Sequence, residues 1–144
     1  MDTNVYDFLE MFKKIDIKDE ILFALEDNAA DYTQRQREQM LKGERGDGKK
    51  IFRLLTGSDE YSDQYAKKKG KKKPIDLHAT GDFQSEIFMD VRDEELFIDS
   101  ADPKSGMLQK DYGDQIFGLQ DEATSEFAET TGEKLVLNIE KKLS

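Results

Sequence analysis

The sequence is poor in the residue types that build compact chemical sites. Its 144 residues include no cysteine, one histidine (His78) and two prolines. Without cysteine, the chain forms no disulfide, no thiolate metal site and no cysteine nucleophile. One histidine cannot supply a multi-histidine metal centre. These absences exclude several classes of enzyme and metalloprotein, and the composition implies no cofactor.

Long apolar runs are also missing. The apolar stretches are a few residues long, too short to cross a bilayer. The first ten residues, MDTNVYDFLE, are acidic and do not show the basic segment and apolar stretch of a secretory signal. We therefore expect an intracellular protein with no membrane contact. A chain of this length can bury one core, so we expect a single domain over residues 1–144.

Charge is abundant and unevenly distributed. The chain carries a net charge of −10, yet residues 67–73 contain six lysines: Lys67, Lys68, Lys69, Lys71, Lys72 and Lys73. Residues 82–129 contain 14 acidic and 3 basic residues. Most of the surface should therefore repel nucleic acid, and any attraction to phosphate must come from the lysine-rich segment.

The first part of the chain has a helical pattern, and we expect helices over residues 4–42. Asp2, Thr3 or Asn4 can cap a short helix with an inward apolar face. Asp16 can cap a longer second helix, with Asp19 at its third position, and Gly43 is a natural stop. The apolar face expected for the first helix consists of Val5, Phe8, Leu9 and Phe12.

The rest of the chain predicts an α+β fold, with helices on a small antiparallel sheet. Residues 43–74 are expected to form a long extended loop, and residues 75–100 the sheet region, because Ile87, Met89 and Val91 alternate with polar residues before a turn at RDEE. Pro103 and Gly106 favour a loop over 101–119. Helical spacing returns over 120–143. Gly132 weakens that helix by about 1 kcal/mol relative to alanine, and LVLNI alone could also be an edge strand.

One glycine-rich stretch, GERGDGKK at residues 43–50, has the spacing of a phosphate-binding loop. Such a loop needs a strand before it, a helix after it and Ser or Thr after the lysine. Here a polar helix is expected before it, no amphipathic helix follows, and Lys50 stands where the hydroxyl is needed. We therefore interpret it as a glycine turn. The tripeptide Arg45–Gly46–Asp47 is too short to indicate adhesion.

The lysine run at residues 67–73 allows two interpretations. It can contact phosphate or an acidic partner, or it can be a solvated, self-repelling loop tip. The many carboxylates do not follow a calcium-loop pattern. His78 is expected on the outer face of a short strand, and no triad or carboxylate pair is evident. We therefore predict no catalytic and no metal-binding residues.

Three stretches in this order resemble a family of small neck proteins of tailed bacteriophages, of the virion-morphogenesis or tail-completion type found in phages and prophages of Bacteroidetes. They are QREQMLKGERGDGKKI, YSDQYAKKKGKKKPIDLHATGDF and YGDQIFGLQDEA, within roughly residues 34–128. The residues that carry the likeness outside the lysine run are Tyr61, Tyr65, Pro74, Asp76, Leu77, Thr80, Gly81, Phe83, Tyr112, Gly113, Phe117, Gly118 and Leu119.

The resemblance implies a non-enzymatic virion protein, assembled in the host cytoplasm. Such a protein forms a homo-oligomeric ring at the head–tail connection or at the top of the tail, around the DNA conduit. Its partners would be copies of itself and portal, adaptor or tail proteins, with transient contact to genomic DNA. The chain departs from the family in its dense lysine cluster and in Thr131–Gly132, which is expected to interrupt the last helix. The alternative is a small nucleic-acid-binding accessory protein that uses the lysine run.

Overall fold

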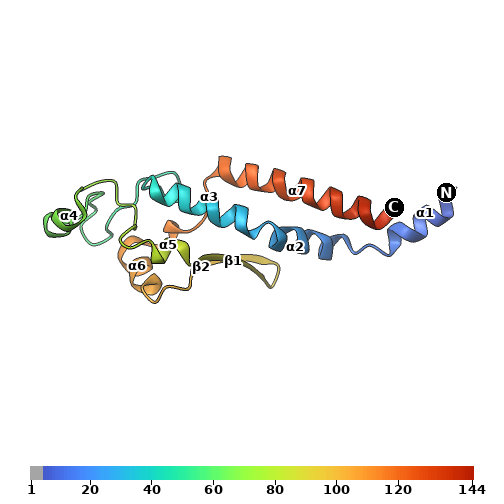
Figure 1. Ribbon diagram of the computed structural model, residues 1–144, viewed down its shortest axis with the longest axis horizontal. Helices are drawn as coiled ribbons and strands as arrows, with labels where there is room; N and C mark the ends of the chain where they lie inside the picture. Colours follow the sequence, from blue (N-terminus) through green and yellow to red (C-terminus); the bar gives the residue numbers. More distant parts are fainter. Residues whose placement is uncertain (1–4) are drawn as a thin grey trace.

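Three helices follow one another along the long axis of the molecule (Figure 1). In the computed structural model, which describes residues 5–144 apart from the Phe8 side chain, they are α1 (Val5–Lys13), α2 (Ile17–Asp27) and α3 (Ala29–Leu41). The longest helix, α7 (Asp121–Leu143), lies beside α2 and α3. Together with a two-stranded antiparallel sheet, these helices confirm the predicted α+β fold.

The predicted cap of the second helix is confirmed. The Asp16 side chain accepts a hydrogen bond of 3.2 Å from the Asp19 amide. The prediction of a single long helix after Asp16 is wrong at one position, because α2 ends at Asp27 and α3 begins at Ala29. Asn28 stands between them, and its side chain bonds to α7 rather than to its own helix. The structure therefore divides the predicted region 4–42 into separate helices.

Gly43 ends α3 as predicted. Its amide donates to the Met40 carbonyl over 2.8 Å, and the Glu44 amide donates to the Gln39 carbonyl over 3.2 Å. These two bonds form a Schellman motif, which places Gly43 in the left-handed region at φ 74°.

The predicted inward face of α1 is not buried. Val5 is 71% exposed, Leu9 47% and Phe12 44%. Figure 1 shows α1 projecting at the end of the molecule, where α7 is its main neighbour among the described helices and strands. The apolar spacing correctly predicts a helix here, but the described part of this end of the molecule has no core that buries its apolar side chains. The expected caps Asp2, Thr3 and Asn4 lie outside the described residues.

A short helix replaces part of the predicted loop over residues 43–74. Helix α4 (Asp63–Lys69) begins at Ser62, whose hydroxyl accepts a bond of 3.3 Å from the Tyr65 amide, and ends at Gly70 with φ 85°. Three lysines occupy its last turn, where the helix dipole favours positive charge. The lysine run is therefore partly helical, and the prediction of a simple loop was wrong there.

The predicted hairpin is confirmed. Strands β1 (Ile87–Arg92) and β2 (Glu95–Ser100) pair with Arg92 opposite Glu95. The two residues between them, Asp93 and Glu94, both have positive φ, as a two-residue type I′ turn requires. Within the rest of the predicted sheet region, residues 75–86 hold no strand, so His78 does not lie on one. The short helix α5 (Asp82–Ser85) precedes the hairpin instead.

Two further elements interrupt the predicted loop over residues 101–119. They are α6 (Ser105–Tyr112) and the 3-10 turn η1 (Asp114–Ile116). Local polar bonds outweigh Pro103 and Gly106: the Asp102 carboxylate accepts from the Lys104 amide over 2.7 Å, and the Ser105 hydroxyl donates to Asp99 over 2.6 Å. The loop prediction was therefore wrong over α6.

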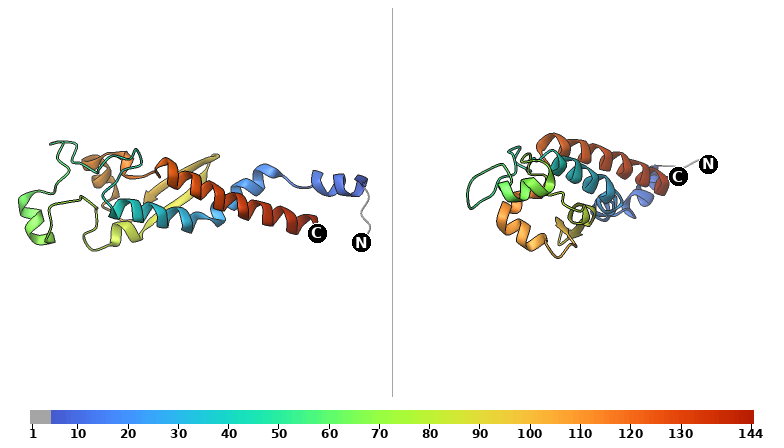
Figure 2. Two further views of the ribbon diagram at one scale, coloured as in Figure 1. Left: turned by 90° about the horizontal axis from the view of Figure 1, so that it is seen from above. Right: turned by 60° about the vertical axis from the view of Figure 1, so that its left-hand side comes forward.

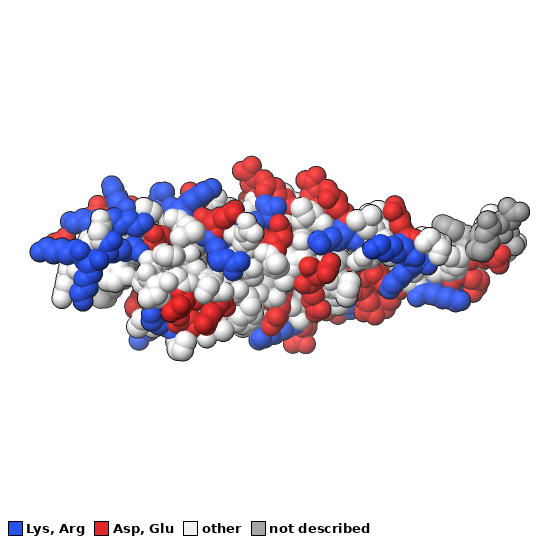
Figure 3. Space-filling view, viewed as in Figure 1, with Lys and Arg blue, Asp and Glu red and all other residues white. Residues whose placement is uncertain are grey.

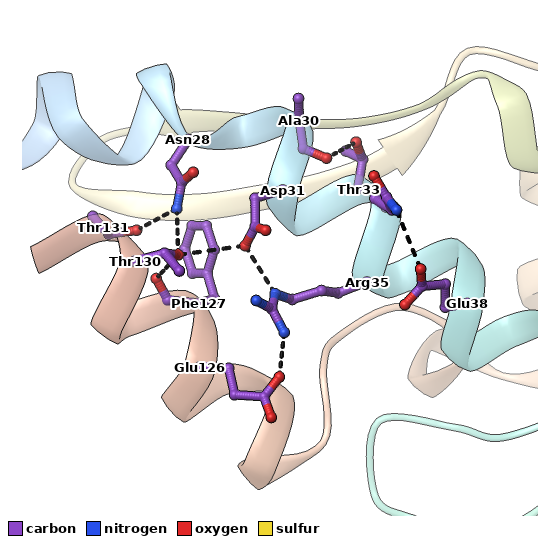
Figure 4. A network of polar contacts seen from close by, with 11 residues as sticks. Asn28, Ala30, Asp31, Thr33, Arg35, Glu38, Glu126, Phe127, Thr130 and Thr131 are labelled. Carbon is purple, nitrogen blue, oxygen red and sulfur yellow. Dashed lines mark hydrogen bonds and ion pairs between the residues drawn. The ribbon is translucent and has the colours of Figure 1, made fainter. Parts of the chain in front are cut away.

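Helix α7 is continuous through Thr131 and Gly132, which corrects the expected interruption and the alternative edge strand. Figure 4 shows why this part of α7 is fixed. The side-chain amide of Asn28 donates to the Thr130 and Thr131 hydroxyls over 2.9 and 3.0 Å. One turn away, Arg35 bonds Asp31 over 2.8 Å and forms an ion pair with Glu126.

The core has two parts. A small cluster of Tyr32, Met89 and Phe127 joins α3, β1 and α7, with the two rings in edge-to-face contact at 5.1 Å. The larger cluster fills the end of the molecule that carries α4, α5 and α6. Its members are Met40, Ile51, Tyr61, Ala66, Ile75, Leu77, Phe83, Ile87 and Ile116.

Candidate interaction site at the basic end

The end of the molecule that carries α4 is basic, whereas most of the chain is acidic. Residues 43–74 contain ten basic and five acidic residues in a protein of net charge −10. Figure 3 shows the densest group of lysine and arginine side chains at this end, whereas carboxylates and scattered basic side chains alternate over the remaining length of the visible face. The molecule is therefore electrically polar along its long axis.

The six lysines of the run have different roles. Three are held by carboxylates of the chain: Lys69 lies 3.0 Å from Asp76, Lys71 lies 2.6 Å from Asp76, and Lys72 lies 2.6 Å from Asp63. The other three, Lys67, Lys68 and Lys73, are exposed and form no ion pair with any residue of 5–144. Only these three, of the predicted contact residues, are available to a partner without breaking an internal pair.

Asp76 is the centre of a buried polar network. Burial alone would raise the pKa of its carboxyl group, but hydrogen bonds from Lys71 and Lys69 outweigh burial and lower the pKa to about 2. The carboxylate also accepts from the His78 amide over 3.1 Å, and the Gln84 side chain donates to the Asp76 carbonyl over 2.6 Å. The Asp76 carboxylate therefore stays ionised and ties α4 to the segment after it.

Tyr61 completes this network. Its hydroxyl accepts from the amides of Asp76 and Leu77 over 3.2 and 3.0 Å and donates to the Asp76 carboxylate over 3.2 Å. Burial raises the pKa of the Tyr61 hydroxyl, which keeps its proton for this bond. These contacts hold Leu77 at φ 56°, a left-handed conformation that is uncommon for leucine.

Pro74 lies against the end of α3. A side chain at Gly43 would place its Cβ 2.4 Å from the Cβ of Pro74, so only glycine fits there. This close approach brings together the first two of the three stretches on which the phage-protein resemblance rests.

The third stretch is held by two glutamines that the sequence reading did not single out. The Gln36 side chain donates to the Ile116 carbonyl over 3.1 Å and accepts from the Gly118 amide over 2.8 Å. The Gln39 side chain donates to the Gly118 carbonyl over 2.8 Å and accepts from the Gln120 amide over 2.9 Å. Their i, i+3 spacing on a polar helix was the available signal.

The glycine-rich stretch 43–50 is a packed turn, as interpreted from the sequence. Helix α3 leads into it, and residues 51–62 contain neither helix nor strand. Arg45 is buried, pairs with Asp47 at 2.8 Å and lies 4.8 Å from the centre of the Phe52 ring. The Gly46 amide donates to the Gln115 carbonyl over 2.9 Å. The turn therefore fixes the fold and has no phosphate cradle.

A cleft of about 420 Å³ opens beside the Asp76 network, between α4, residues 77–83 and α6. Its walls are largely aromatic and apolar. Seven of the thirteen residues that carry the resemblance line it: Tyr61, Tyr65, Leu77, Thr80, Gly81, Phe83 and Tyr112. The sequence motif thus marks a concave surface, hereafter the tyrosine cleft.

The other motif residues support this end of the fold. Gly113 has positive φ next to Leu54, Phe117 packs 5.8 Å from the Phe83 ring, and Leu119 packs on the small cluster. Gly118 bonds to both glutamines of α3.

Charged groups at the tyrosine cleft give it a cationic edge. Arg53 and Lys104 line it, opposed by one carboxylate, Asp111. The Nε of Arg53 is buried and has no hydrogen-bond partner among the described residues. A buried guanidinium N–H without an acceptor is uncommon in folded proteins. The cleft therefore offers an apolar pocket with a cationic edge.

Within residues 5–144, no group of three or more histidine, aspartate or glutamate side chains is placed to hold a metal ion. None of the helices described is both long enough and apolar enough to cross a membrane. No protein-family model matches the chain, and neither a curated protein nor a solved structure shows significant similarity to it.

Proposed function

We propose that this protein is a structural subunit of a tailed-phage particle. It would form part of the neck, the head–tail connection or a tail-completion ring around the DNA conduit, together with copies of itself and portal, adaptor or tail proteins. Its work would be to present complementary surfaces, with no reaction catalysed. This proposal joins the sequence resemblance to the surface described above.

The observation that supports it most is the separation of charge along an elongated chain. A basic end and an acidic body on one molecule attract each other between copies, and repeated contact between two different surfaces generates a ring when the rotation closes. Lys67, Lys68 and Lys73 add charge that the chain does not neutralise internally. An acidic channel wall would also keep DNA from adhering while it passes.

Exposed apolar side chains on the helical body also favour assembly. Besides α1, they include Phe23 on α2 and Val136 and Leu137 on α7, each more than half exposed. Large exposed apolar groups of this kind are typical of surfaces that a partner covers.

The direct test is to purify phage particles from cells that carry the gene and to identify their proteins by mass spectrometry. We expect the chain in the particle, in a fixed ratio to the portal protein. Its absence from DNA-filled, tailed particles would overturn the proposal.

A second test addresses the basic end. The double variant Lys67→Glu, Lys68→Glu should fold normally but reduce particle assembly or genome retention. The matched control is Lys14→Glu, Lys141→Glu, which changes the net charge equally at exposed positions in the other half of the molecule. Equal particle yields from both variants would count against a role for the basic end.

The alternative is a nucleic-acid-binding accessory protein. One observation favours it: Lys73 and Lys50 line the same hollow, so unpaired positive charge extends from α4 toward the glycine-rich turn. DNA binding by the purified protein should then weaken with salt, with a slope that counts the phosphate contacts. No salt-dependent binding would leave assembly as the better explanation of the lysines.

A further inference from the structure

An amphipathic helix with an exposed apolar face, α1, and the tyrosine cleft lie at opposite ends of the molecule. Helix α1 projects at one end, and the tyrosine cleft opens at the other, beside α4 and α6 (Figures 1 and 2). They cannot meet within one chain. Any contact between them must join two copies.

The cleft has the chemistry of a receptor for an apolar helix face. The tyrosine cleft measures about 420 Å³ and has largely apolar walls, and an amphipathic helix binds such a hydrophobic groove with its apolar face. Tyr65 and Met107 line it and are exposed to solvent. Arg53 and Lys104 at the cationic edge can attract a carboxylate of the bound partner.

Helix α1 has the matching features. Val5 and Leu9 stand one turn apart on the same face, with Tyr6 next to them, and all three are exposed. The helix also carries Asp7 and Glu10. Apolar side chains at i and i+4, flanked by carboxylates, are how an amphipathic helix binds a groove with a cationic edge.

Charge favours a copy of the chain over a membrane as the occupant. Between Val5 and Lys13, α1 has two acidic residues and one lysine. Helices that bind membrane surfaces usually carry a basic polar face. The cleft, in contrast, is lined by two basic residues, Arg53 and Lys104, and by one acidic residue, Asp111.

We propose that the tyrosine cleft of one subunit binds helix α1 of the next. This inference rests on the proposed self-assembly and names the contact through which it occurs. Because the two surfaces differ, the contact is heterologous, and its repetition gives a closed ring or an open chain. Val5 and Leu9 would enter the cleft, and a carboxylate of α1 would lie beside the cationic edge formed by Arg53 and Lys104.

The absence of cysteine in the chain makes the contact directly testable. Two single-cysteine proteins, Leu9→Cys on α1 and Met107→Cys in the cleft, are mixed at high concentration and oxidised. We expect the mixed disulfide dimer to form at least about tenfold faster than with the control pair Leu9→Cys and Glu129→Cys, which places the second thiol on an exposed site of α7. Equal rates for the two pairs would overturn the proposal.

A second variant checks the contact without cross-linking. Leu9→Asp removes the central apolar side chain of α1 at an exposed position, so the monomer should keep its thermal unfolding midpoint. Its incorporation into particles should fall at least about tenfold. A protein with both Val5→Cys and Leu9→Asp should also form the mixed disulfide with the Met107→Cys protein at least about tenfold more slowly than Val5→Cys alone. Normal incorporation would overturn the α1 contact but leave the virion role intact. Absence of the wild-type chain from particles would instead overturn the virion role.

Discussion

The carboxylate of Asp76 lies 2.6 Å from the Nζ of Lys71, and its second oxygen lies 3.0 Å from Lys69. This relationship explains why a segment with six lysines can fold against the body of the molecule. Two of the lysines share one buried carboxylate, and a third is paired with Asp63. The paired lysines of the run therefore hold the fold together, and the unpaired ones remain exposed for a partner.

Replacing Asp76 with asparagine should destabilise the protein. The change leaves Lys69, which is largely buried, without its carboxylate. Breaking a buried ion pair by removing one partner costs about 3–5 kcal/mol, and we expect about 2–4 kcal/mol because Lys71 remains partly exposed. Chemical denaturation measures the difference. The control is Asp63→Asn, which removes a solvent-exposed pair and should change the unfolding midpoint far less. Equal shifts for the two variants would contradict the role given to Asp76.

The same carboxylate should make stability depend on acid. The pKa of Asp76 is lowered to about 2 in the folded protein, against about 3.9 in an unfolded chain. Its contribution to stability is therefore complete above about pH 4 and is lost as the pH falls toward 2, with about 2.6 kcal/mol for a shift of this size. The gap in unfolding free energy between wild type and Asp76→Asn should narrow over this pH range. A gap that stays constant would show that Asp76 does not titrate as described.

Gln36 should contribute more to stability than any exposed glutamine of α3. It is 0% exposed and bonds both the Ile116 carbonyl and the Gly118 amide. The variant Gln36→Ala leaves both backbone groups without partners, at about 1–3 kcal/mol for each buried group. Gln34 on the same helix is exposed and bonds only Glu38, so Gln34→Ala is the matched control. Similar melting temperatures for the two variants would contradict this assignment.

The sequence predicted the fold best where local chemistry decides. The Asp16 cap, the Gly43 stop and the alternating strands depend on neighbours within a few residues, and all three are confirmed. Helix α4 was missed because the repulsion of the lysines is visible in the sequence, whereas the carboxylate that relieves it, Asp76, lies beyond the run. Helix α6 was missed because its start depends on hydrogen bonds that the Asp99 and Asp102 carboxylates accept from Ser105 and from the Lys104 amide.

The candidate site was predicted only in part. Seven of the thirteen residues that carry the resemblance line the tyrosine cleft, but the order of residues in the sequence does not reveal a concave surface. The division of the lysines into paired and unpaired depends on distances across the fold. The exposure of α1 could not be predicted either, because an apolar helical stripe looks the same whether its own chain or a neighbour covers it.

Lys67 and Lys69, two residues apart on α4, should separate assembly from folding. Lys69 is paired with Asp76 and lies 5.3 Å from the centre of the Tyr61 ring, so Lys69→Met should lower the unfolding midpoint. Lys67 is exposed and has no ion pair within residues 5–144, so Lys67→Met should leave the midpoint unchanged and weaken binding to an acidic partner or to DNA. Thermal unfolding and a salt-dependent binding assay together distinguish the two variants. The reverse pattern would contradict the division of the lysines.

Gly132→Ala should stabilise the protein. Gly132 lies inside the continuous helix α7, and a Cβ added there meets no atom within 4 Å. Alanine is favoured over glycine in a helix interior by about 1 kcal/mol, because it loses less conformational freedom on folding. The opposite result is expected for Gly43→Ala, where φ is 74° and the new Cβ would lie 2.4 Å from Pro74. The two substitutions add the same methyl group. Opposite signs for the changes that they cause in the free energy of unfolding would therefore come from the different backbone conformation and packing at the two sites. A loss of stability in Gly132→Ala would contradict a continuous helix at this position and favour the interruption that the sequence alone predicts.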